Sequence, residues 1–133
     1  MRLGECLALS WDDIDMKAQM LHVHATLVNG GVQPMPKTAG SIRDIPFGRK
    51  LHAILKDAHR KMARNRLRYG QYYRQSDRVC VFEDGTPVDA DAMRYFNHYC
   101  KETFGAGSFH SLRHTHATML LEAGEELEIV SKR

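Results

Sequence analysis

The residues best suited to chemistry lie together in the run His110-Ser111-Leu112-Arg113-His114. His110 and Arg113 are three residues apart, and a helix holds side chains at that spacing on one face. Arginine presents a planar fork of donors to a phosphate or another oxyanion, and histidine can donate or transfer a proton. The pair is a weak signal alone. It gains weight from Arg2-Leu3-Gly4-Glu5 near the other end of the chain and from Lys37 between them.

Three cations from separate segments suggest one type of site. Arg2, Lys37 and Arg113 would together bind a phosphodiester and stabilise the additional negative charge of a pentacovalent transition state. The arginines would supply fixed bidentate geometry, whereas the lysine would supply a mobile proton donor. Taken singly, each of these residues is more often a surface charge, so the fold must bring them together for the site to exist.

The elements that would position these residues follow from the spacing of apolar side chains. Helical spacing predicts helices over residues 2–9, 50–69, 89–104 and 109–123, and another from about residue 125. Alternation and turn residues predict strands over residues 20–28, 32–36 and 41–46, with a hairpin at Asn29-Gly30-Gly31. We therefore expect one α+β domain over residues 1–133. It is mainly helical, and a small antiparallel three-stranded sheet packs on its helical core.

The composition is typical of a soluble globular protein. Hydrophobic residues make up 43% of the chain and charged residues 26%, and no apolar run is long enough to span a membrane. The three cysteines, Cys6, Cys80 and Cys100, are odd in number and widely spaced, so we expect them to be reduced and buried in a cytoplasmic protein. Helical patterns reach both ends of the chain without a start or stop signal, which favours a fragment of a longer protein.

Basic side chains concentrate in the middle of the chain. Between Lys50 and Arg78, nine lysines and arginines stand against Asp57 and Asp77, so this window carries a net charge of +7. Such a face favours a polyanionic partner through counterion release, although a solvated helix surface would show the same pattern. The residues that we expect to contact such a partner are Arg43, Lys50, Arg60 and Arg64.

Three segments together resemble the tyrosine recombinase (phage integrase) family. The run Arg2-Leu3-Gly4-Glu5, continued by residues 7–15, is similar to the segment of that family that carries its first catalytic arginine. Residues 36–46 resemble its β-hairpin, in which a lysine precedes a threonine and an arginine-x-isoleucine-proline strand follows. Residues 109–118 resemble its His-x-x-Arg segment. The three motifs occur in the order of the family, whereas residues 49–107 match it only in helical character.

The resemblance implies a specific chemistry. In this family a tyrosine hydroxyl attacks a DNA phosphodiester without a metal or another cofactor, a 3′-phosphotyrosine forms, and the 5′-hydroxyl leaves. By position, Arg2 and Arg113 would clamp the scissile phosphate, and Lys37 would be the general acid for the leaving oxygen. His110 would assist proton transfer or hold the phosphate, and Glu5 would be a supporting carboxylate that orients the arginine helix.

The resemblance stops short at the nucleophile. In the family this tyrosine follows the His-x-x-Arg segment, but all five tyrosines of the chain precede His110: Tyr69, Tyr72, Tyr73, Tyr95 and Tyr99. We therefore expect no nucleophile in the chain and no covalent link to DNA formed by it alone. The family acts as a homotetramer on paired double-stranded DNA sites, and we expect this fragment to be monomeric or weakly dimeric.

Other functions remain open on the sequence alone. A non-catalytic DNA-binding or regulatory module on the same fold would keep the basic face. A general interaction domain would neither catalyse a reaction nor bind nucleic acid. A zinc site is disfavoured: His110 and His114 have a suitable spacing, but no cysteine pair or zincin motif completes a ligand set. We therefore expect no metal.

Overall fold

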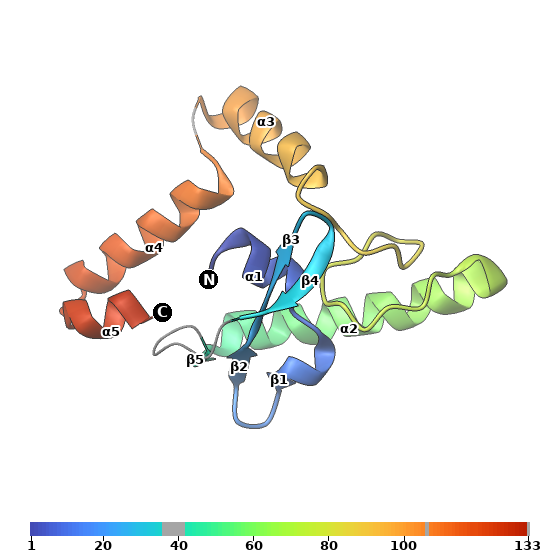
Figure 1. Ribbon diagram of the computed structural model, residues 1–133, viewed down its shortest axis with the longest axis horizontal. Coiled ribbons are helices and arrows are strands. Elements are labelled where there is room, and N and C mark those ends of the chain that lie inside the picture. The colour runs from blue at the N-terminus through green and yellow to red at the C-terminus, as the bar shows by residue number, and fades with distance from the viewer. Residues whose placement is uncertain (36–41, 106, 133) are drawn as a thin grey trace.

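The computed structural model describes residues 1–35, 42–105 and 107–132, and it is mainly helical (Figure 1). The helices are α1 (Leu3–Ala8), α2 (Arg49–Tyr69), α3 (Ala92–Phe104), α4 (Phe109–Glu122) and α5 (Leu127–Lys132), with short 3₁₀ turns η1 (Trp11–Asp13) and η2 (Gly70–Tyr72). These bounds lie within a few residues of the predicted ones, and the predicted α+β class is confirmed. None of the helices in the described ranges is both long and apolar enough to cross a bilayer.

The strands form two separate antiparallel sheets. They are β1 (Ile14–Asp15), β2 (Met20–Val23), β3 (Ala25–Val28), β4 (Gly31–Pro34) and β5 (Arg43–Pro46). A three-stranded sheet has the order β1-β2-β5, and β3 pairs only with β4 as a hairpin. The expectation of one strand over residues 20–28, in one sheet with residues 32–36, is therefore wrong.

The chain leaves the three-stranded sheet at His24. The Met35 backbone N–H donates to the His24 carbonyl at 2.8 Å, and the His24 imidazole lies 2.7 Å from the Asp13 carboxylate. These bonds satisfy His24 outside the β2–β5 ladder, so the following residues turn away to form the β3–β4 hairpin. Side-chain alternation runs through residues 20–28 without a break, and it therefore could not reveal this change of sheet.

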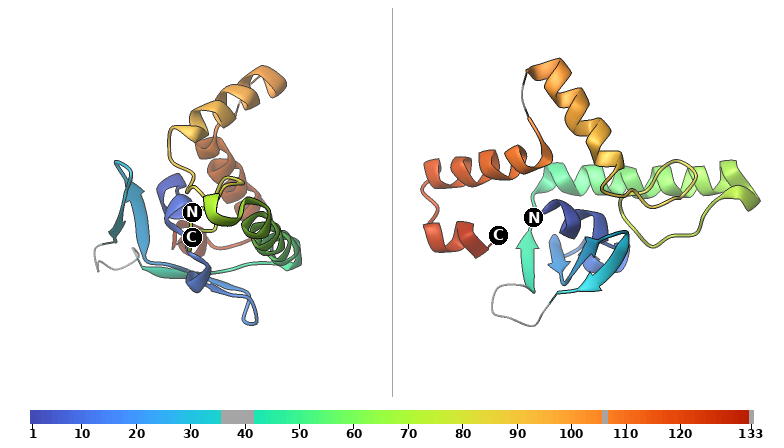
Figure 2. Two further views of the ribbon diagram at one scale, coloured as in Figure 1. Left: turned by 90° about the vertical axis from the view of Figure 1, so that its right-hand side faces the viewer. Right: turned by 45° about the horizontal axis from the view of Figure 1, so that its top comes forward.

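The main apolar core lies between the three-stranded sheet and α2. Its buried members are Leu9, Ile14, Leu21 and Leu55, and half-buried side chains such as those of Trp11 and Ile45 pack around them. Figures 1 and 2 show α2 running along the sheet as a long rod. The predicted apolar stripe of α2 thus packs against the three-stranded sheet.

The three cysteines depart from the prediction in one respect. Cys6, Cys80 and Cys100 are free thiols, as expected, but each is half-buried rather than fully buried. Cys80 is held close to α1, where its sulfur lies 3.9 Å from the Cys6 carbonyl oxygen. Both residues sit where the chain around Val79 meets the end of α1, and this packing leaves part of each side chain at the surface.

Helix α1 is short but tightly held. Its residues Glu5, Leu7 and Ala8 are buried, and it packs against β3. Gly4 lies at this contact, where a Cβ atom would be 2.5 Å from the Thr26 hydroxyl oxygen and 2.9 Å from the Leu27 carbonyl oxygen. The absence of a side chain at Gly4 therefore allows α1 to approach the hairpin closely.

Replacing Gly4 by alanine is expected to destabilise the protein. In a free helix this change stabilises by about 1 kcal/mol. Here the methyl group meets a backbone carbonyl that cannot move alone, so we expect a net loss of about 1–3 kcal/mol, as for other overpacked sites. Urea denaturation would measure it. Gly31→Ala is the matched control, because its Cβ would meet only the Val28 carbonyl at 3.7 Å. Equal effects at both positions would contradict the close contact.

Candidate active site

One pocket is lined by residues from distant parts of the chain. Its volume is about 470 Å³, and it is lined by Met1, Arg2, Leu3, Asn97, Ser108, Phe109, His110 and Arg113. The lining comes from the start of α1, the middle of α3 and the start of α4. Figure 1 and the right-hand view of Figure 2 both show the N-terminal end of α1 on the side of α4. The structure therefore brings together the two arginines and the histidine that the sequence singled out.

Arg2 stands at the entrance to α1, in an extended conformation just before the first helical residue. Its backbone N–H donates to the Glu5 carboxylate at 2.7 Å, and its guanidinium donates to the same carboxylate at 3.2 Å. The side chain nevertheless remains 69% exposed. Arg2 is thus fixed at its base by a capping interaction, while most of its guanidinium is available to a ligand.

Glu5 is the buried counterion of the site, with only 1% of its surface exposed. Besides Arg2, it accepts hydrogen bonds from the Arg43 guanidinium at 2.7 and 3.4 Å. Burial by itself raises the pKa of the Glu5 carboxyl, but the bonds from Arg43 and Arg2 outweigh it and hold that pKa below its usual value. Glu5 is therefore a carboxylate at neutral pH.

The other wall is the first turn of α4. The Ser108 hydroxyl caps this helix by accepting from the Ser111 backbone N–H at 3.2 Å, and the Asn97 side-chain oxygen accepts from the Phe109 N–H at 3.1 Å. The bond from the Phe109 N–H to Asn97 ties the start of α4 to α3. His110 and Arg113 consequently project from the positive end of a capped helix, which favours an anion beside them.

The Arg113 guanidinium is half-buried in the wall of the pocket. Its Nη1 atom is buried and has no hydrogen-bond partner among the residues that the structure describes. A buried donor without an acceptor is costly, and a guanidinium nitrogen even more so because it is charged. A phosphate oxygen entering the pocket would supply that acceptor.

His110 does not stand alone. Its Nε2 atom lies 2.8 Å from that of His114, one turn later on α4, and the two rings meet edge to face. A hydrogen bond between these nitrogens requires one of them to be unprotonated, so the two rings share one proton at this contact. This contact holds the His110 ring against His114 beside the pocket.

The remaining predicted residues are placed differently. Lys37 lies outside the described residues. Lys50, Arg60 and Arg64 are exposed on α2 and do not line the pocket. Arg43 was expected at a DNA-binding surface, but its side chain is only 11% exposed and is directed to Glu5. The structure thus directs the Arg43 guanidinium to the buried Glu5 carboxylate and away from solvent.

Two polar residues of the lining, Ser108 and Asn97, are not among the predicted site residues. Ser108 could have been found, because a serine directly before a predicted helix is a typical N-cap. Asn97 lies in the middle of α3 and carries no signal of its own, since its role depends on how α3 meets α4. No tyrosine is among the residues found to line the pocket.

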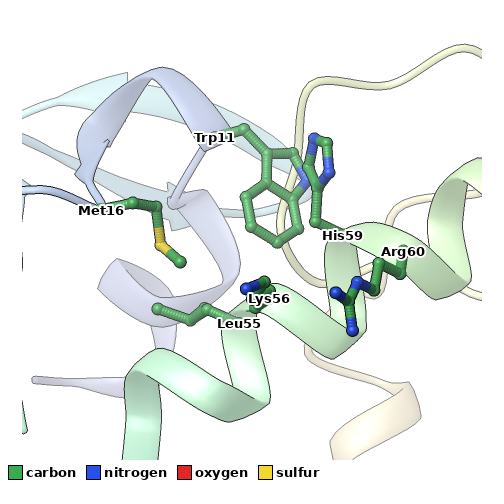
Figure 3. A pocket seen from close by; sticks show the side chains of 6 residues that line it. All are labelled: Trp11, Met16, Leu55, Lys56, His59 and Arg60. Carbon is green, nitrogen blue, oxygen red and sulfur yellow. The ribbon is translucent and has the colours of Figure 1, made fainter. Parts of the chain in front are cut away.

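A second cavity, of about 390 Å³, lies between η1 and α2 (Figure 3). It is lined by Trp11, Met16, Leu55, Lys56, His59 and Arg60. Trp11 and His59 pack edge to face with ring centroids 4.9 Å apart. All the polar residues of this lining come from α2, and its floor is continuous with the apolar core. It therefore lacks the convergence of distant cations that marks the first pocket.

Comparisons of the sequence point to one family. The sequence profile of the phage integrase family matches residues 1–133. A tyrosine recombinase XerC-like protein of Caldanaerobacter subterraneus subsp. tengcongensis is 31% identical over 99% of this chain, and the ICEBs1 integrase of Bacillus subtilis is 32% identical over all of it. The chain spans 38% and 37% of the lengths of these two proteins.

Solved structures show the same fold. The Tn1549 transposon integrase, in complex with circular intermediate DNA, superposes with a TM-score of 0.77 at 17% identity, covering 99% of this chain and 46% of the integrase chain. XerA recombinase gives a TM-score of 0.69 at 19% identity, covering 98% of this chain and 42% of its own. The chain therefore shares the fold of these larger proteins.

Proposed function

The chain belongs to the phage integrase family, and on that premise we propose that residues 1–133 form the phosphate-binding part of a tyrosine recombinase active site. One observation supports this proposal above all. Arg2, His110 and Arg113 line one pocket, and the buried Nη1 atom of Arg113 has no acceptor in the described part of the chain. The function is site-specific breakage and rejoining of double-stranded DNA in the cytoplasm, as in the integration of a mobile element.

The chemistry assigns a role to each group. Arg2 and Arg113 hold the non-bridging oxygens of the scissile phosphate and stabilise the charge that builds up in the pentacovalent transition state. His110 holds the same phosphate or moves a proton, with His114 able to share it. Lys37 is proposed, from its place in the hairpin motif, to protonate the leaving 5′-oxygen. A tyrosine hydroxyl from outside residues 1–133 attacks phosphorus and becomes the 3′-phosphotyrosine.

The surroundings of the pocket are assigned to DNA backbone contact. Lys50, Arg60 and Arg64 are exposed on one long helix, and their charge suits a duplex that extends beyond the scissile phosphate. We propose that the longer protein assembles as a homotetramer on two DNA sites, and that residues 1–133 alone stay monomeric or weakly dimeric.

Salt dependence of DNA binding tests the proposal. The affinity of residues 1–133 for a DNA duplex should fall steeply with salt, and Arg113→Ala should lower the slope of log affinity against log salt by about 1. Fluorescence anisotropy over a salt series would measure both. Arg94→Ala is the control, because Arg94 is exposed on α3 and pairs with Asp91. Binding that ignores salt, or equal effects of the two variants, would contradict the proposal.

A non-catalytic DNA-binding module is the second candidate. It is favoured by the basic residues exposed on α2, Lys50, Arg60 and Arg64, which can bind DNA without any cleavage chemistry. It predicts the same salt dependence but no strand cleavage, even when the full-length protein is used. Single-turnover cleavage of a nicked duplex by the full-length protein separates the two candidates.

A further inference from the structure

The Glu5 carboxylate is shared by two guanidiniums of unequal exposure. Arg43 donates to both of its oxygens, at 2.7 and 3.4 Å, and is 11% exposed. The Arg2 guanidinium donates to one oxygen only, at 3.2 Å, and is 69% exposed. Arg43 is thus the principal partner of Glu5. The Arg2 guanidinium makes only one hydrogen bond to Glu5, and Arg2 lines the pocket.

Arg43 also fixes one element to another. It is the first residue of β5, where it pairs with Val23 of β2, and its side chain reaches across to α1. Strand β5 directly follows the segment that contains Lys37, six residues earlier in the sequence. The bond from Arg43 to Glu5 therefore links the start of β5 to α1, the helix that Arg2 caps.

The charge balance explains why two arginines are needed. A buried carboxylate must be neutralised, either by a cation or by a proton. Without Arg43, the only charged partner of Glu5 among these contacts would be Arg2. The Arg2 guanidinium would then turn inward to bond both carboxylate oxygens, and fewer of its donors would face the pocket. Glu5 would compete with the phosphate for Arg2.

We propose that Arg43 is a positioning residue that saturates Glu5 and so keeps the Arg2 guanidinium free for the DNA phosphate. The inference rests on the proposed function of the pocket. Arg43 acts through Glu5 and does not touch DNA. This role separates Arg43 from the exposed cations of α2, although all of them are basic residues within a short stretch of sequence.

A double-mutant cycle tests this role. Arg2→Ala should weaken binding of a DNA duplex about tenfold, as expected for the loss of one charged hydrogen bond. Arg43→Met should weaken it to a similar extent in the wild-type background, but by less than about twofold in the Arg2→Ala background, because the two act through one contact. Arg64→Ala is the matched control on α2, and its effect should be additive with that of Arg2→Ala.

Removing Glu5 should reverse the effect of Arg43→Met. In the double variant R43M/E5Q no buried charge is left to attract Arg2, so binding should return to the level of E5Q alone. R43K should retain much of the wild-type affinity, because an ammonium still neutralises Glu5. The double variant and R43K also keep the test decisive if R43M does not fold, which circular dichroism would reveal.

A second measurement does not depend on DNA. Phenylglyoxal modifies accessible guanidiniums, and mass spectrometry can follow Arg2 by itself. The modification of Arg2 should slow in R43M and recover in R43M/E5Q. An additive cycle with a lower salt slope for R43M would instead mean that Arg43 contacts DNA, and unchanged reactivity of Arg2 would refute positioning. Arg2→Ala could leave DNA binding intact while the phenylglyoxal reactivity of Arg2 still slows in R43M and recovers in R43M/E5Q. In that case the proposed function fails and the positioning role stands.

Discussion

Replacing Arg113 by alanine in the full-length protein is expected to slow DNA strand cleavage by ~10²–10³, the usual effect of removing one charged donor from a transition state. Arg113 projects from the capped start of α4, and its buried Nη1 has no acceptor within the described ranges until a phosphate arrives. Arg113→Lys should recover only part of the rate, because an ammonium keeps the charge but lacks the planar fork.

Single-turnover cleavage of a nicked duplex, which traps the covalent intermediate, would measure this effect. Arg94→Ala on α3 provides the control and should cleave at the wild-type rate. Residues 1–133 alone should give no covalent band. Full activity of Arg113→Ala would remove Arg113 from the catalytic machinery. A covalent band that maps to one of the five tyrosines of residues 1–133 would overturn the assignment of an external nucleophile.

Replacing Glu5 by glutamine is expected to have the largest effect on stability. Removal of one partner from a buried ion pair typically costs about 3–5 kcal/mol, because the other charge remains in the interior without compensation. In this protein that charge is the Arg43 guanidinium, which is 11% exposed. Glu83→Gln is the matched control: Glu83 pairs with Lys61 and Arg68 at the surface, so its loss should cost at most about 1 kcal/mol.

The effect of Glu5→Gln should depend on pH. The pKa of Glu5 is lowered in the folded protein, so its stabilising contribution is complete above the unfolded value of 4.5 and is lost as the pH falls through the folded value. The difference in unfolding free energy between the wild type and Glu5→Gln should therefore be full at pH 7 and shrink below about pH 4.5. Urea denaturation at several pH values would show this. A difference that grows in acid would contradict the ion-pair account.

Some features of the fold could be read from local patterns. The apolar period of α2 and the glycine after Tyr69 gave its two ends almost to the residue, because a helix is stabilised by contacts within its own turns. The local alternation predicts one continuous strand over residues 20–28, whereas the structure divides it at His24. Its division depends on Asp13 and Met35, which lie outside the strand, so the alternation within residues 20–28 does not contain that information.

For the site, the sequence by itself determined the chemistry, and the tertiary structure decided which residues perform it together. The types and order of Arg2, Glu5, His110 and Arg113 were sufficient to suggest a phosphate site, because donors and proton carriers are properties of single side chains. Only the packing of α1, α3 and α4 placed Arg2 and Arg113 at one pocket and directed Arg43 to Glu5 instead of to the surface. Contacts between distant segments depend on how whole elements pack, and burial determines which charges must find a partner inside.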